Sequence, residues 1–224
     1  MLIRLLTTIL IFTSLIKTGP SADLIKETRE KIARINISFL ENRLPGKSSV
    51  SQLDKLLSEL KEKKNSAGSI SNDKDYKDKT DLLLKSFKAF EKFYLSKPEV
   101  DTLKKVFRVV NNEFNSLFGN YFLGELKNSS KKKVILFSTS MSCECTLEMC
   151  YKQEAEIQKL QKENPGLFDY AVVDCFTNFD LQSKYEVGFI PVVLVLDEKG
   201  KEVKRFVREE NLTNELNTYL RKYK

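Results

Sequence analysis

Residues 134–146 of this chain read VILFSTSMSCECT, an apolar run followed closely by two cysteines. A short continuous apolar run is typical of a strand that is buried on both faces of a sheet. The residues from Cys143 to Asn164 have an amphipathic helical pattern that stops at a Pro-Gly pair, so Cys143 is expected at a helix N-terminus. A helix N-terminus stabilises a thiolate, and this stretch therefore predicts thiol chemistry at Cys143.

The residues after this helix predict further strands and helices in alternation. Residues 197–200, Asp-Glu-Lys-Gly, suit a hairpin turn in which Gly200 takes a positive backbone angle. From residue 131 onward the expected order is strand, helix, strand, helix, strand, strand, helix. The strands are expected at residues 134–137, 170–173, 191–196 and 203–207, and the later helices at 179–185 and 211–221.

These elements resemble the thioredoxin superfamily over residues 131–224. The likeness rests on the strand that leads to Cys143, on a strand that ends at Asp174, and most specifically on residues 185–191, YEVGFIP, ahead of an apolar strand. The resemblance implies an α/β thioredoxin-like C-terminal domain with a central mixed sheet flanked by helices. It also implies a cis peptide bond before Pro191, beside Cys143, and thiol–disulfide exchange with protein thiols or disulfides of client proteins.

The cysteine motif, residues 142–146, departs from the family's pattern. Aligning the strand places Cys143 at the family's nucleophilic cysteine, whereas Thr146 stands where the second, resolving cysteine would be. Ser142 replaces the family's Trp, and Phe137 replaces the buried acid that accepts a proton. The sequence therefore predicts a monothiol variant in which Thr146 hydrogen-bonds the thiolate and Cys145 resolves the mixed disulfide.

The other two cysteines leave several disulfide pairings open. Cys150 lies seven residues after Cys143, about 10 Å along a helix, which is too far for a bond, so we expect a buried structural thiol. A bond between Cys143 and Cys145 would close a small, strained and labile ring. Cys175 follows the strand that ends at Asp174 and is a possible partner of Cys143 or Cys145. If such a bridge is permanent, the chain is instead a redox-inactive protein-binding module with structural disulfides.

Composition excludes several other classes of function. The chain has no His, which rules out His-based triads and His-ligated metals. The four cysteines do not have a common metal-ligand spacing, so we predict neither a metal nor a small-molecule cofactor. The net charge of +7 is spread thinly and its lysine clusters lack interleaved aromatic residues, so no nucleic-acid partner is expected.

Residues 1–22 have the pattern of a secretory signal peptide, with one early Arg, an apolar core at residues 5–16 and a small-residue end. The core is shorter than the ~20 residues of a membrane-spanning helix, so membrane contact is expected only if the signal remains as an uncleaved anchor. The expected location is the secretory pathway, meaning the endoplasmic reticulum lumen or the extracellular space, or a bacterial periplasm. Disulfides are favoured in these compartments.

Residues 23–127, called here the helical region, have apolar residues at spacings of three and four. They predict four amphipathic helices that form an antiparallel bundle or two helical hairpins. Residues 61–79 lose this periodicity and are rich in Lys, Ser, Asn and Asp, which predicts a mobile loop. The sequence assigns the helical region no chemistry and leaves it as a docking surface, a spacer or a dimerisation element.

Overall fold

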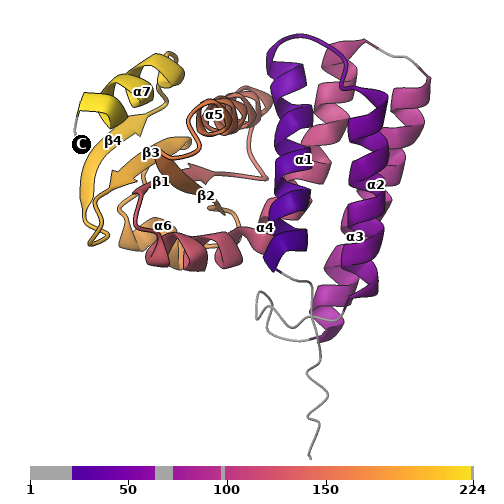
Figure 1. Cartoon of the computed structure of the whole chain (residues 1–224), viewed down its shortest axis with the longest axis horizontal. Helices are drawn as coiled ribbons and strands as arrows, with labels where there is room; N and C mark the ends of the chain where they lie inside the picture. The colour runs from indigo at the N-terminus through magenta and orange to yellow at the C-terminus, as the bar shows by residue number, and fades with distance from the viewer. Residues whose placement is uncertain (1–21, 64–72, 97–98, 223–224) are drawn as a thin grey trace, which may run out of the picture.

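The computed structural model describes residues 22–63, 73–96 and 99–222 (Figure 1). The helical region contains α1 (Ala22–Leu40), α2 (Lys47–Glu62), α3 (Asp73–Leu95) and α4 (Val100–Asn128). The C-terminal part contains β1 (Lys132–Ser138), α5 (Glu144–Glu163), β2 (Phe168–Asp174), α6 (Phe179–Lys184), β3 (Val192–Leu196), β4 (Glu202–Val207) and α7 (Leu212–Lys222). This order confirms the predicted fold class.

The signal peptide predicted at residues 1–22 lies outside the described residues except for Ala22, which begins α1. Among the described helices, none combines the length and the apolar character that crossing a membrane requires.

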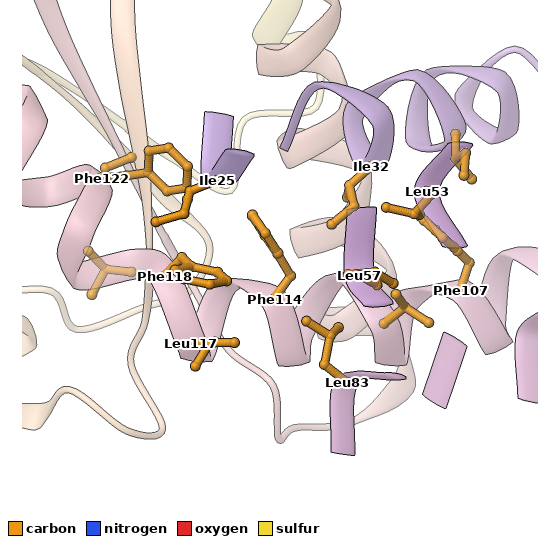
Figure 2. Packing of buried hydrophobic residues seen from close by; sticks show 14 of the residues in the cluster. Ile25, Ile32, Leu53, Leu57, Leu83, Phe107, Phe114, Leu117, Phe118 and Phe122 are labelled. Atoms are coloured by element: carbon orange, nitrogen blue, oxygen red, sulfur yellow. The ribbon is translucent and has the colours of Figure 1, made fainter. Parts of the chain in front are cut away.

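The four helices of the helical region form a bundle in which each helix contacts the next and α1 also contacts α4. Their apolar faces meet in a core of aliphatic and phenylalanine side chains (Figure 2). Phe90 and Phe107 lie in this core, with ring centroids 4.8 Å apart, and both are fully buried. The aromatic residues that recur at helical spacing in these helices therefore make core contacts.

The loop predicted at residues 61–79 is too long, because α2 continues to Glu62 and α3 already begins at Asp73. Tyr76 accounts for the difference. Its ring is 3% exposed, and its hydroxyl donates a hydrogen bond of 2.8 Å to the carbonyl oxygen of Leu60. One buried aromatic side chain anchors this polar first half of α3 against α2, a tertiary contact that local composition does not reveal. Residues 64–72 lie outside the described part of the chain.

The C-terminal part is built on a mixed four-stranded sheet in the order β2-β1-β3-β4. Strands β1 and β2 are parallel, whereas β3 is antiparallel to both β1 and β4. Gly200 has a φ of +81° in the turn between β3 and β4, as the sequence predicted. Figure 1 shows α5 and α7 on one side of the sheet and α4 and α6 on the other.

The apolar core is continuous between the helical region and the sheet. Side chains of alternate strand residues, among them Phe137 and Val173, join the same buried cluster as α4 and the other bundle helices. Helix α4 approaches β2 closely at Gly119, where an added Cβ would lie 2.9 Å from the carbonyl oxygen of Val172. The opposite face of the sheet packs against α5 and α7 in a second cluster. Whether the helical region and residues 131–224 are separate domains stays a prediction.

A buried polar network fixes α5 to the bundle. The Glu154 carboxylate on α5 accepts hydrogen bonds from Asn111 at 2.8 Å and from Asn115 at 3.0 Å, both on α4. Asn36 on α1 donates to the side-chain oxygens of Asn111, at 2.9 Å, and Gln158, at 3.0 Å. Buried polar groups are costly unless they are paired, and this pairing specifies how α1, α4 and α5 fit together.

Candidate functional site

The cysteine motif lies at the edge of the sheet where β1 ends and α5 begins. Cys143 is the N-cap residue of α5. Phe137 pairs with Val192 of β3, so Pro191 is next in register to Ser138 at this same edge. The peptide bond between Ile190 and Pro191 is cis.

The loop between β1 and Cys143 is held by Asp174, the last residue of β2. The Asp174 carboxylate accepts hydrogen bonds from the backbone N–H of Ser140, at 2.9 Å, and from its hydroxyl, at 2.7 Å. Thr139 closes the same loop, because its hydroxyl contacts the backbone N–H and the carbonyl oxygen of Met141. A buried carboxylate on the neighbouring parallel strand thus sets where α5 starts.

The two sulfurs of the motif are in contact and face solvent. The Sγ atoms of Cys143 and Cys145 are 2.8 Å apart, and the Cys143 Sγ is 3.3 Å from the Thr146 Oγ1. Both cysteines are exposed and neither is in a disulfide. The structure therefore brings together three of the predicted site residues at the first turn of α5.

This arrangement lowers the pKa of Cys143 to about 6. The largest cause is the hydrogen bond with Cys145, followed by those with the side chain and backbone of Thr146. All of them favour the thiolate form, and the N-terminus of α5 adds the positive end of a helix dipole. At neutral pH the group is about 90% ionised, which makes it a nucleophile.

Glu144, between the two cysteines, would be expected to oppose a thiolate by its negative charge. In the structure its carboxylate is bound in a bidentate manner by Arg108 of α4, at 2.8 and 3.2 Å. This ion pair lowers the pKa of Glu144. Sequence reasoning missed Arg108, because periodicity does not say which face of α4 meets α5.

The remaining cysteines lie apart from the motif. Cys150 is 2% exposed on α5, and burial raises the pKa of its thiol, as suits a structural residue. Cys175 is equally buried, with its pKa raised to about 12 by burial first and then by the charges of Asp174 and Cys150. Among the described residues, Cys175 makes no contact with Cys143 or Cys145.

The alternation of side chains in β2 explains this difference from the predicted pairing. Cys175 continues the row of Ala171 and Val173, which packs into the cluster that contains α4. In contrast, α5 packs its Ile157 and Leu160 on the opposite face. Successive residues of a strand point to opposite faces, so Cys175 points away from the side of the sheet that α5 covers.

The predicted topology and the site now occur together: a mixed sheet, a cysteine at the start of the helix after β1, and a cis proline before β3. The C-terminal part thus has the thioredoxin-like fold that the sequence predicted. The term thioredoxin-like part is used below for residues 131–224.

Several solved structures are similar to this chain over part of its length. A thioredoxin of Fasciola hepatica matches with 25% identity over 46% of this chain and 91% of its own, at a TM-score of 0.37. Mitochondrial thioredoxin 3 of Saccharomyces cerevisiae matches with 17% identity over 45% and 89%, at 0.36. Thioredoxin NaTrxh of Nicotiana alata matches with 22% identity over 47% and 84%, at 0.37. No family model matches the chain, and no curated protein matches it significantly.

The thioredoxin-like part keeps the departures that the sequence indicated. Phe137 stands where the family has a buried acid. It is fully buried and packs against Tyr185, with ring centroids 5.5 Å apart, so an aromatic contact replaces the acid at this position. Among the described residues, no three His, Cys, Asp or Glu side chains form a cluster able to hold a metal ion. The absence of a cofactor stays a prediction.

Proposed function

We propose that this protein exchanges thiols and disulfides with protein partners, with Cys143 as the nucleophile and Cys145 as the resolving thiol. One observation carries the proposal: an exposed Cys143 with a pKa of about 6 lies in contact with a second exposed thiol. Reactive cysteines are characteristically exposed and of low pKa, whereas buried thiols such as Cys150 are inert.

The exchange takes two steps. The Cys143 thiolate attacks one sulfur of a client disulfide, which forms a mixed disulfide and releases the other client sulfur as a thiolate. The Cys145 thiolate then attacks the Cys143 sulfur, which forms a Cys143–Cys145 disulfide and releases the second client thiolate. The client gains two electrons and the motif loses two. Because the small ring is strained, a client dithiol readily reduces the Cys143–Cys145 disulfide, so the exchange is reversible and runs in both directions.

Apolar side chains at the same edge of the sheet support a protein partner. Met141, before the motif, is 66% exposed, and Phe189, ahead of Pro191, is 72% exposed. Phe176, directly after β2, is 47% exposed. The segments that carry them follow β1 and β2 or precede β3, so all three lie around the cysteine motif. Exposed apolar groups gathered at one place are typical of a contact surface.

We also propose that the exchange takes place in the secretory pathway or a periplasm. The support is the signal-peptide pattern of residues 1–22. These compartments supply disulfide-bonded clients. The location is tested by fractionating the native cells and sequencing the N-terminus of the recovered protein: a start near residue 23 supports the proposal, and an intact Met1 on protein from the cytosolic fraction contradicts it.

The exchange is tested with a fluorogenic peptide that contains one disulfide. The reduced protein is expected to open it, and Cys143→Ser is expected to abolish the reaction. Cys145→Ser should attack once and then remain as a mixed disulfide through Cys143, detected as a mass increase on non-reducing analysis.

Two outcomes would contradict the proposal. If Cys143→Ser reacts as fast as the parent, the nucleophile lies elsewhere. If Cys145→Ser forms no covalent adduct and the parent leaves the peptide intact, the chain is the redox-inactive binding module that the sequence left open.

A further inference from the structure

The helical region contributes directly to the surroundings of the cysteine motif. Arg108 of α4 donates from Nη2 to Glu144 Oε2 at 2.8 Å and from Nη1 to Glu144 Oε1 at 3.2 Å. Glu144 is the first residue of α5 and the direct neighbour of Cys143. The contact therefore joins the helical region to the turn of helix that holds the thiol.

This ion pair differs from an ordinary surface pair. Exposed pairs contribute little because both side chains stay hydrated and mobile. The side chain of Arg108 is only 13% exposed, although that of Glu144 is 55% exposed. A bidentate pair with one largely buried partner has a fixed geometry.

A second pair of side chains supports the same contact, one turn earlier in α4 and one turn later in α5. Lys104 of α4 binds Glu148 of α5 at 2.5 Å, and Arg108 Nη1 lies 3.8 Å from the same carboxylate. Lys104 is also 3.5 Å from Asp101, and Lys105 is 3.9 Å from Glu144. Three cations from α4 thus face two carboxylates from α5.

The charge balance has a consequence for the thiol. Without Arg108, the Glu144 carboxylate would keep only the exposed Lys105, 3.9 Å away, and its largely unscreened negative charge next to Cys143 would disfavour the thiolate. With Arg108 in place, the pair is neutral and the Glu144 side chain is held toward α4. The first turn of α5, which carries the hydrogen bonds from Cys145 and Thr146, is held with it.

We infer that Arg108 is a positioning residue through which the helical region sets the reactivity of Cys143, by neutralising Glu144 and fixing the first turn of α5. This inference rests on the proposed function, since it concerns the same thiol. It assigns chemistry to a part of the chain for which the sequence suggested only docking, spacing or dimerisation.

The test measures the rate of alkylation of Cys143 by iodoacetamide between about pH 5 and pH 9. All proteins carry Cys145→Ser, so that Cys143 is the one exposed thiol among the four cysteines. Arg108→Gln is expected to raise the midpoint of the pH profile by about half a unit to one unit, which slows alkylation near pH 6 about two- to fivefold. Glu144→Gln alone is expected to lower the midpoint by a few tenths of a unit.

The double variant Arg108→Gln/Glu144→Gln separates charge from general damage to the fold. Its midpoint is expected to return close to that of the parent, because the unpaired carboxylate is gone. Lys26→Gln is the matched control for net charge: Lys26 of α1 pairs with Glu125 near the end of α4, and its loss is expected to leave the midpoint unchanged. Raising the salt concentration should reduce the effect of Arg108→Gln.

The inference is overturned if Arg108→Gln leaves the midpoint within about 0.2 unit of the parent, or if the double variant fails to restore it. If Arg108→Gln does not fold, the Glu144→Gln variant still tests the inference. A midpoint of its alkylation profile that is not lower than that of the parent contradicts the inference. Alkylation requires no client, so the midpoints can be measured whether or not the peptide is reduced. Failure of the peptide exchange would overturn the proposed function, whereas unchanged midpoints would overturn the inference about Arg108.

Discussion

At the residue scale, the reactivity of Cys143 depends on a few hydrogen-bond donors. The sequence predicted that Cys143 begins a helix, that Thr146 contacts its sulfur, and that Cys150 is buried, because spacing along one helix decides all three. It could not predict the ion pair of Arg108 with Glu144, because that contact depends on how α4 and α5 pack. For Cys175 it offered a disulfide with Cys143 or Cys145, which stays a prediction; in the structure Cys175 is a free, buried thiol in the cluster that contains α4.

Thr146→Val is expected to raise the pKa of Cys143. The variant keeps the shape of a side chain that is 8% exposed and removes a hydroxyl 3.3 Å from the sulfur. A hydrogen bond to a charged acceptor favours the ionised form, so the pKa should rise by about half a unit to one unit from about 6. Alkylation should slow severalfold near pH 6. Above about pH 8 it should approach the parent rate, because Cys143 is then ionised in the parent and in the variant alike.

Thr28→Val is the matched control for this substitution. Thr28 is a buried threonine of α1 whose hydroxyl bonds the carbonyl oxygen of Leu24. Its replacement should leave the pH profile of Cys143 unchanged. A profile for Thr146→Val that coincides with that of Thr28→Val would show that the hydroxyl does not stabilise the thiolate.

At the element scale, α4 belongs to both parts of the molecule. Its first half packs in the bundle through residues such as Phe107, whose ring lies against that of Phe90, and its second half approaches β2 at Gly119. Periodicity predicted that α4 exists, but not what its buried side chains pack against. Likewise, the start of α3 was missed because Tyr76 is its one large apolar anchor in a polar stretch.

Gly119→Ala is expected to destabilise the protein by about 1–3 kcal/mol, because the new methyl group would lie 2.9 Å from the Val172 carbonyl oxygen and push α4 away from β2. Gly124 of the same helix has nothing within 4 Å of an added Cβ. Gly124→Ala should therefore be neutral or stabilise by up to about 1 kcal/mol, as alanine does in a helix. Urea unfolding followed by circular dichroism measures both; equal effects of the two substitutions would contradict the close approach.

Glu154 makes stability depend on pH. Burial raises its pKa to about 7 from the model-compound value of 4.5, although hydrogen bonds from Asn115 and Asn111 oppose the shift. The folded protein thus holds this proton more tightly than the unfolded chain. The group's contribution to stability is fully present below about pH 4.5 and is lost as the pH rises through about 7, a loss of roughly 3 kcal/mol.

Replacing Glu154 by Gln should flatten this part of the pH dependence. The difference in unfolding free energy between about pH 5 and pH 8 is expected to shrink by roughly 2–3 kcal/mol relative to the parent. Glu163→Gln, at the last residue of α5, is the control for loss of one carboxylate. If Glu154→Gln and Glu163→Gln give the same pH dependence as the parent, Glu154 is ionised in the folded protein throughout this range.

At the scale of the whole molecule, one buried cluster runs from the bundle through α4 to the sheet. Residues 128–131 read NSSK, a polar stretch where helical periodicity gives way to strand, and α4 ends at Asn128. Local patterns mark where one element stops, whereas a shared core depends on contacts between residues far apart in the chain. Continuity of the core implies that the two parts unfold together.

Cooperative unfolding can be measured because the chain has no Trp, so a single introduced Trp gives a local signal. Phe93→Trp reports on α3, where the side chain is half exposed, and Tyr219→Trp reports on α7, where the ring lies 6.3 Å from that of Phe206. In each variant the urea transition seen by fluorescence is expected to coincide with that seen by circular dichroism. Adding Gly119→Ala, at the contact between α4 and the sheet, should shift both transitions to lower urea by the same amount. Transitions that separate, or a Gly119→Ala shift seen by only one reporter, would mean that the helical region and the thioredoxin-like part fold as independent domains.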